Sequence, residues 1–181
     1  MALRWMYDAS TPPETPPHWH VVGGYIGGNT PHVWTEAEWN AQPAPYRLPI
    51  FTASNRSDDA AMANIDGGII REQLTALGVR EGMLVCVDTE TTVYTYYLEH
   101  LNMAVRPWRL MNYGSLSFVI RNPVTDGGRW AALWTGDIFK DIPLIGQHHI
   151  VAAQWASDVM LHKPYDASVI DGSLPLWPAH L

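Results

Sequence analysis

Short apolar runs, bounded by glycine, proline or polar clusters, recur along the whole chain. Runs of this length and setting are typical of strands in a buried sheet. The clearest one covers residues 83–90, begins after Gly82 and ends in two carboxylates, Asp88 and Glu90. The pattern predicts eight strands, at residues 4–8, 20–26, 48–52, 83–90, 109–113, 130–135, 149–155 and 165–170.

Helical patterns lie mainly in the first two thirds of the chain. Thr35 followed by Glu38 forms a capping box, which predicts the start of a short helix. Apolar residues near a 3.6-residue spacing predict one helix over residues 58–78 and another over residues 93–101. Residues 116–120 predict one or two further turns. The connections between the last three strands are too short for full helices.

This order of elements predicts an α/β fold, a (β/α)8 TIM-like barrel with a reduced last third, of β5α5β3-like type. With 181 residues the chain is long enough to bury one core, so we expect a single domain over residues 1–181. The segment 11–17 holds four prolines and is expected to be a loop.

Composition and charge exclude several partners. The net charge is -7 and the only lysines are Lys140 and Lys163, so no basic surface for nucleic acid is expected. No run approaches the ~20 apolar residues of a membrane span. The N-terminus lacks the pattern of a signal peptide, so another agent is expected to deliver the protein to any target outside the cytoplasm. The single cysteine, Cys86, lies within a predicted core strand, a poor position for a nucleophile.

Carboxylates end three of the predicted strands: Asp8 the first, Asp88 with Glu90 the fourth, and Asp166 the eighth. Alternation along a strand places Asp88 and Glu90 on one face, with α-carbons roughly 6.6 Å apart. In (β/α) barrels such strand ends converge on one mouth, where active sites are built. The alternative for the pair alone is an aspartate that caps the next helix beside a solvated glutamate.

Histidines offer a weaker signal for metal binding. His18 and His20 share one face of an extended segment, and His148 and His149 add two more imidazoles. Their spacing matches no compact zinc motif, so we expect polar loop histidines, with no metal and no other cofactor.

Three motifs make the sequence similar to the lysozyme-type muramidases of glycoside hydrolase family 25. Asp88-Thr89-Glu90 resembles the D-x-E of that family, and Tyr113-Gly114-Ser115 follows the fifth strand, with Trp134 in the sixth. The third motif is the ending, residues 154–157 and 165–172. It differs from the family in the reversed order of Gln154 and Trp155 and in Ser168, where the family usually has Asn. The first half looks more like related barrel domains of unassigned function in bacteria and phages.

The resemblance implies hydrolysis of a glycosidic bond in bacterial cell-wall peptidoglycan, as by a phage lysin. Glu90 would be the general acid, its pKa raised in a semi-enclosed acidic site, and Asp88 would stay ionised to stabilise the transition state. Asp8 and Asp166 would hold sugar hydroxyls or the attacking water. The candidate substrate-binding residues are Tyr113, Trp134, Trp155, Tyr25 and Asp137.

In a second interpretation, the chain has the same barrel fold but does not catalyse hydrolysis. In it, the chain binds cell-wall glycan without cleaving it, or is a structural component of a phage virion or tail that contacts other phage proteins. The presence of all four strand-end carboxylates favours the enzyme.

Overall fold

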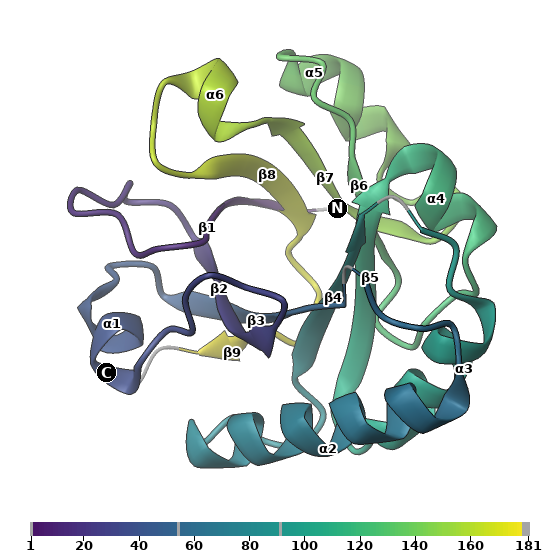
Figure 1. Cartoon of the computed structure of the whole chain (residues 1–181). Helices are drawn as coiled ribbons and strands as arrows, with labels where there is room; N and C mark the ends of the chain where they lie inside the picture. Colours follow the sequence, from purple (N-terminus) through teal and green to yellow (C-terminus); the bar gives the residue numbers. More distant parts are fainter. Residues whose placement is uncertain (1, 54, 91, 179–181) are drawn as a thin grey trace.

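The computed structural model describes residues 2–53, 55–90 and 92–178, and its strands form a closed barrel (Figure 1). Each strand pairs with the next in the chain, and β8 pairs with β1 to close the barrel. The predicted TIM-like α/β barrel is therefore confirmed. Its strands are β1 (Leu3–Ala9), β2 (Val21–Gly28), β3 (Tyr46–Thr52), β4 (Leu84–Glu90), β5 (Arg109–Ser115), β6 (Arg129–Ala132), β7 (Ile150–Ala156) and β8 (Asp166–Asp171).

Strand direction corrects one prediction. Strands β1 to β7 run parallel to one another, whereas β8 is antiparallel to both β7 and β1. Asp166 is therefore the first residue of its strand, and the prediction that it ends a strand is wrong. Because β8 is reversed, its first residue lies at the end of the barrel where β1 and β4 finish, so Asp166 still reaches the mouth.

Helices surround part of the barrel only. The two longest, α2 (Ala60–Ala76) and α3 (Thr95–Ala104), pack against each other beside β2 and β5. The connections after β6 and β7 hold only very short helices, as the sequence predicts. The other helical elements are α1 (Glu36–Ala41), α4 (Leu116–Arg121), α5 (Ile138–Asp141), η1 (Ile142–Leu144) and α6 (Asp158–Leu161). No helix in the described residues has the length and apolarity needed to cross a bilayer.

One short strand was not predicted. The segment β9 (Trp177–Pro178) pairs antiparallel with the start of β3, at Tyr46 and Arg47. Its two residues carry too little pattern to be recognised in the sequence.

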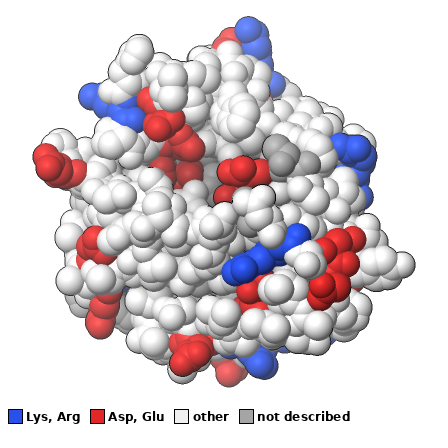
Figure 2. Space-filling model, in the orientation of Figure 1, with Lys and Arg blue, Asp and Glu red and all other residues white. Residues whose placement is uncertain are grey.

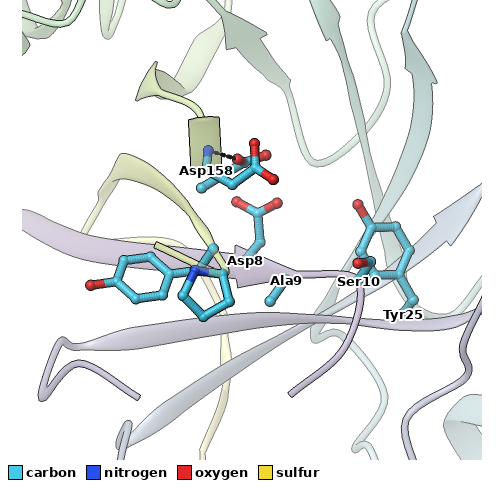
Figure 3. A pocket seen from close by; sticks show the side chains of 8 residues that line it. Asp8, Ala9, Ser10, Tyr25 and Asp158 are labelled. Atoms are coloured by element: carbon cyan, nitrogen blue, oxygen red, sulfur yellow. Dashed lines mark hydrogen bonds between the residues drawn. The ribbon is translucent and has the colours of Figure 1, made fainter. Parts of the chain in front are cut away.

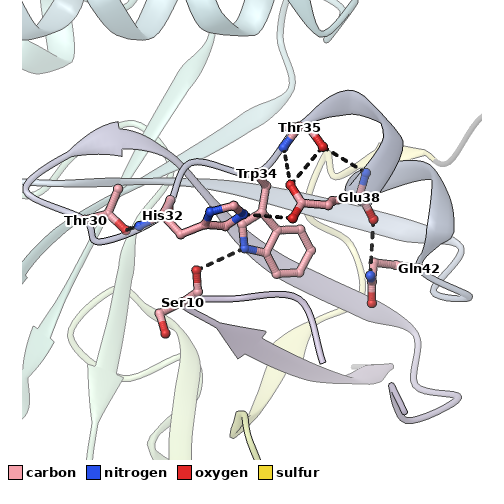
Figure 4. Close-up of polar contacts among 7 residues, drawn as sticks. All are labelled: Ser10, Thr30, His32, Trp34, Thr35, Glu38 and Gln42. Carbon is pink, nitrogen blue, oxygen red and sulfur yellow. Dashed lines mark hydrogen bonds and ion pairs between the residues drawn. The ribbon is translucent and has the colours of Figure 1, made fainter. Parts of the chain in front are cut away.

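Polar contacts fix the loops that follow β1 and β2 (Figure 4). The predicted capping box at the start of α1 is present: the Glu38 backbone N–H donates to Thr35 Oγ1, and the Thr35 backbone N–H donates to Glu38 Oε2. The Trp34 indole N–H donates to the carbonyl of Ser10 at 3.3 Å. This bond ties the loop after β2 to the residue that closely follows Asp8.

The inside of the barrel is filled by apolar side chains. Leu84 and Cys86 of β4 point inward, as the alternation predicts, and belong to the same buried cluster as Met6 and Met111. A second cluster fills the space between the outside of the sheet and the helices. The inner cluster ends below the mouth of the barrel, where polar side chains begin.

Candidate functional site

The inward-facing layer nearest the mouth is polar. Side chains alternate along a strand, so the residue two positions beyond an apolar inward residue also faces inward. In this way Met6 is followed by Asp8, Cys86 by Asp88, and Met111 by Tyr113. Strands β1 to β8 place the following residues in this layer: Asp8, Tyr25, Thr52, Asp88, Tyr113, Ala132, Gln154 and Asp166.

Several polar atoms in this layer are buried without a partner. Asp8 is 5% exposed and Asp88 is 4% exposed. Within the described part of the chain, one carboxylate oxygen of each, and the hydroxyl of Thr52, find no hydrogen-bond partner. Buried polar atoms in folded proteins are nearly always paired, because an unpaired one costs desolvation energy. The unpaired oxygens of Asp8, Thr52 and Asp88 share one layer, where a polar ligand would complete their bonding.

The first cavity at the mouth is acidic and has a volume of about 140 Å³. Figure 3 shows the Asp8 carboxylate pointing toward Asp158, and the Asp158 backbone N–H donates to Asp166 Oδ1 at 2.6 Å. Figure 2 shows carboxylate atoms inside a hollow on this face of the molecule. The cavity is lined by Asp8, Ala9, Ser10, Tyr25, Asp158, Pro164, Tyr165 and Asp166.

A glycine makes room for Asp8. Gly23 is the neighbour of Asp8 on β2, and a β-carbon there would lie 2.7 Å from the Asp8 β-carbon and 2.9 Å from Ile50 Cδ1. Any side chain at this position would displace one of the two. The Asp8 carboxylate thus occupies space that only a glycine leaves open.

Burial and mutual repulsion keep protons on the buried carboxyls. Burial, followed by the charges of Asp166, Asp88 and Asp158, raises the pKa of Asp8 well above its usual range. Burial, together with the charge of Glu90, raises the pKa of Asp88 to about 8, although a hydrogen bond from the Glu90 backbone N–H opposes the shift. At neutral pH the unliganded mouth therefore holds Asp88 protonated, which differs from the expectation that it stays ionised.

Burial also raises the pKa of the third carboxyl, Asp166. The hydrogen bond from the Asp158 backbone N–H acts against this shift and lowers the pKa. Asp166 is more open to solvent than Asp8 and Asp88. The charges of Asp88 and Asp166 both act on Asp8, so added negative charge at the mouth is costly.

A β-bulge separates Glu90 from Asp88. Asp88 pairs with Tyr113 and Glu90 with Gly114, so Thr89 is the extra residue, and Glu90 has a φ of 44°. The Thr89 hydroxyl donates to the Tyr113 carbonyl at 2.7 Å, which holds the bulge. The bulge breaks the simple alternation on which the sequence prediction relied. Asp88 is buried inside the barrel, whereas Glu90 is exposed at its rim.

Glu90 lines a second cavity, of about 130 Å³, with a more apolar wall. Its other lining residues include Tyr113, Ser115 and Trp134, whose indole is 53% exposed. A carboxylate beside a flat, accessible ring suits a bound sugar, because the apolar face of a sugar ring can stack on the indole. Glu90 and Trp134 are thus brought together as the sequence predicts.

Tyr113 and Tyr25 lie close enough to the carboxylates for the negative charges to act on both phenols. Burial and the charges of Asp8, Asp88 and Asp166 raise the pKa of both phenols well above 10, so both keep their protons. The Tyr113 hydroxyl donates to Gln154 Oε1, and its ring packs 4.6 Å from the ring of Trp130. Gln154 in turn lies beside Asp166 and lowers the pKa of that carboxyl. Tyr113 therefore connects the two cavities through side-chain contacts.

Two predicted residues lie elsewhere. Asp137 accepts a hydrogen bond from the Phe139 backbone N–H, pairs with Lys140 at 3.5 Å, and lines neither cavity. Trp155 follows inward-facing Gln154, so its side chain points to the outside of the barrel, where it contacts Trp5. The structure corrects the grouping of Asp137 and Trp155 with the mouth residues.

Three residues of the mouth were missed in the sequence. Asp158 follows the seventh strand, so the rule that identified Asp8 and Asp88 could have found it. Gln154 stands in a quoted motif but carries no charge that distinguishes it. Thr52 ends the third strand and gives no signal beyond its position. Among the described residues, no group of three or more His, Cys, Asp or Glu side chains is arranged to hold a metal ion.

The strand arrangement and the polar mouth define a TIM-like barrel with one reversed strand and an acidic cleft. The chain is similar in structure to an uncharacterized protein of B. stearothermophilus, with a TM-score of 0.68 and 16% identity over 96% of this chain and 99% of that one. It is also similar to the modular autolysin LytC of Streptococcus pneumoniae, solved alone at 1.6 Å and in complex with a synthetic peptidoglycan ligand. The TM-score is 0.54 and the identity 13%, over 92% of this chain.

These likenesses establish the fold. The chain spans 46% of the LytC chain, less than half of that modular protein. No protein-family model and no curated protein matches the sequence. Membership of glycoside hydrolase family 25 therefore stays a prediction from the motifs.

Proposed function

We propose that this protein is a glycoside hydrolase that cleaves a polysaccharide of the bacterial cell wall. The observation that carries the proposal is the pair of unlike carboxyls at the mouth. Asp88 is buried and protonated at neutral pH, and Glu90 is exposed in a cavity with an accessible indole. Glycosidases use two carboxyl groups in different environments, one as acid and one as base, nucleophile or charge stabiliser. The fold shared with an autolysin that has been solved with a peptidoglycan ligand supports this choice of substrate.

In the proposed reaction, Glu90 gives a proton to the glycosidic oxygen as the bond to the anomeric carbon breaks. A sugar lying on Trp134 would also cover Glu90, which lines the same cavity. The step requires the proton of Asp88 to pass to Glu90 before the bond breaks, so that Asp88 carries the charge that stabilises the positive transition state. A water molecule adds to the anomeric carbon and returns one proton to the site.

In the proposed reaction, the other carboxyls bind and orient the sugar and the attacking water. Asp8, Asp166 and Asp158 surround the acidic cavity, where the unpaired Oδ1 of Asp8 can accept a hydrogen bond from a sugar hydroxyl or from the attacking water. The protonated phenol of Tyr25 can donate a hydrogen bond near the reacting centre, whereas the Tyr113 hydroxyl donates its proton to Gln154 and orients that side chain. The muramyl bond of peptidoglycan remains the proposed point of cleavage, and delivery by a phage remains the proposed route to the wall.

The test is the release of soluble fragments from purified peptidoglycan, followed by mass spectrometry and reducing-end analysis. The wild type should release new reducing ends, and Glu90→Gln should lower the rate at least 100-fold, the usual contribution of a general acid. The matched control is Glu81→Gln, which removes the same charge from an exposed turn before β4 and should leave the rate unchanged.

Each outcome bears on one of the two interpretations made from the sequence. Equal rates for the wild type and Glu90→Gln would show that Glu90 is not the general acid. No release by any of the proteins, combined with sedimentation of the wild type on the same peptidoglycan, would support the glycan-binding module instead.

A further inference from the structure

The outer face of β1, β7 and β8 is covered by aromatic rings instead of full helices. In the described chain, residues 10–20 join β1 to β2 without a helix, and only the four-residue α6 follows β7. Trp5 packs against Trp19 and Trp155, with ring centroids 5.7 and 6.3 Å away. Tyr7 and Tyr165 continue the cluster, each with its ring within 6.3 Å of Trp19. These five residues form the outer aromatic cluster.

The outer aromatic cluster borders an open groove. Its cavity has a volume of about 440 Å³, larger than either cavity at the mouth, and Trp5 is 39% exposed. No Asp, Glu, Lys or Arg lines it, so its wall is uncharged apart from any protonated imidazole. The lining residues are Trp5, His18, Trp19, His20 and Trp155.

The groove is distinct from the mouth but continuous with it. On β1, Asp8 faces into the barrel, whereas Trp5 and Tyr7 face out, so the two surfaces lie on opposite sides of the same strand. Tyr165 lines the acidic cavity, and its ring lies 5.8 Å from the ring of Trp19, which lines the groove. An aromatic surface therefore runs from the edge of the mouth over the rim to the outside of the barrel.

We propose that this groove is a second carbohydrate-binding site, which holds uncharged N-acetylhexosamine units of a glycan strand outside the cleavage cavity. Three indoles provide flat apolar surfaces for sugar rings, and two imidazoles provide hydrogen-bonding groups for hydroxyl or acetamido groups. The uncharged wall fits a neutral saccharide better than a phosphate or an acidic peptide. The choice of glycan rests on the proposed function, whereas the existence of the site does not.

The cluster also fills the space that a helix would otherwise cover, so the test needs a measurement that packing alone would not change. All binding measurements start from the Glu90→Gln variant, which is expected to bind the saccharide without cleaving it. Trp5→Ala in this variant should weaken binding to a β-1,4-linked N-acetylglucosamine hexasaccharide about tenfold by calorimetry, because truncating a partly exposed indole removes a stacking surface. Trp5→Phe should recover most of the affinity.

The matched control is Tyr96→Ala, which removes an exposed ring of α3 that lines no part of the groove and should leave the affinity unchanged. Titration of a ¹⁵N-labelled protein adds a direct readout. The indole N–H signals of Trp5 and Trp19, assigned from Trp→Phe variants, should shift with saccharide. If Trp5→Ala lowers the melting temperature strongly, His18→Ala, a change in an exposed loop residue, provides the affinity comparison instead.

The outcomes separate this inference from the proposed function. Weaker saccharide binding by Trp5→Ala, with no hydrolysis by the wild type, would support the groove and contradict the enzyme. Unchanged affinity and unshifted indole signals, with hydrolysis intact, would overturn the groove alone. An absence of saccharide binding by every protein would also overturn it.

Discussion

Asp8 and Asp166 are paired residues on the antiparallel strands β1 and β8, although they stand near opposite ends of the chain. The charge of Asp166 is the largest electrostatic contribution, after burial, to the raised pKa of Asp8. The reversal of β8 thus concentrates negative charge at the mouth, where Asp88 and Asp158 are also close enough to act on Asp8. A cleft of this kind costs folding energy and is typical of sites that act on protons or bind polar ligands.

The first prediction concerns stability and pH. The pKa of Asp88 is about 8 in the folded protein against an ordinary value of 3.8, so its contribution to stability is complete below pH 3.8 and is lost as pH rises toward 8. Asp88→Asn, which mimics the neutral carboxyl, should leave stability nearly unchanged at pH 4. It should raise the free energy of unfolding by ~5–6 kcal/mol at pH 8.5, because the two pKa values differ by about four and each pKa unit is worth about 1.4 kcal/mol.

Urea denaturation of both proteins at several pH values checks this prediction. The charge of Asp88 also raises the pKa of Asp8, and Asp88→Asn removes that contribution, so the difference between the two curves reports Asp88 together with its effect on Asp8. Glu81→Gln serves as the control for loss of an exposed carboxylate. A difference that stays constant from pH 4 to 8.5 would show that Asp88 is not protonated in the folded protein.

The second prediction concerns the space beside Asp8. Gly23→Ala should destabilise the protein by ~1–3 kcal/mol, because the new methyl group would overlap the side chains of Asp8 and Ile50. Gly68→Ala is the matched control, since no atom lies within 4 Å of a β-carbon there and the residue is inside α2. It should stabilise by ~0.5–1 kcal/mol. Chemical denaturation measures both, and equal effects of the two substitutions would contradict the packing described here.

The third prediction concerns the bulge that separates Asp88 from Glu90. Thr89→Val removes the buried hydroxyl that donates to the Tyr113 carbonyl, and should cost ~1–3 kcal/mol in stability. Because Thr89 positions Glu90, kcat for peptidoglycan hydrolysis should fall about tenfold while KM changes little. Thr89→Ser restores the hydroxyl and should recover kcat. If the serine variant is as slow as the valine variant, the hydroxyl does not position Glu90.

The fourth prediction concerns the link between Tyr113 and Gln154. Tyr113→Phe removes the hydroxyl that donates to Gln154 and leaves a buried amide oxygen without that donor. The free energy of unfolding should fall by ~1–3 kcal/mol. Hydrolysis should slow because Gln154, which lies beside Asp166, loses the bond that orients it. Thermal unfolding and the peptidoglycan assay measure the two effects, and an unchanged melting temperature would contradict the buried hydrogen bond.

Much of the fold could be predicted from local patterns. The apolar run before Asp88 identifies a core strand because it is short, follows a turn signal at Gly82 and is rich in β-branched residues. Thr35 with Glu38 marks the start of α1 because the capping bonds span only three residues. Local pattern also identified Asp8, Asp88 and Glu90, because each is a carboxylate at the end of a predicted strand. The pattern places them at a mouth without showing how they face one another.

Other features of the site depend on hydrogen bonds between segments far apart in the chain. The direction of β8 is decided by its pairing with β1 and β7, and nothing within residues 166–171 states it. The same is true of Trp155, whose outward orientation follows from the inward position of Gln154 in the register with β8.

The sequence by itself therefore determined the elements, the barrel class and the carboxylates at the mouth, because hydrophobic periodicity and capping act over a few residues. Only the tertiary structure decided that Asp88 is buried and Glu90 exposed, because the bulge at Thr89 is set by pairing with β5. Burial in turn depends on which side chains surround a group, and it is burial that raises the pKa of Asp88.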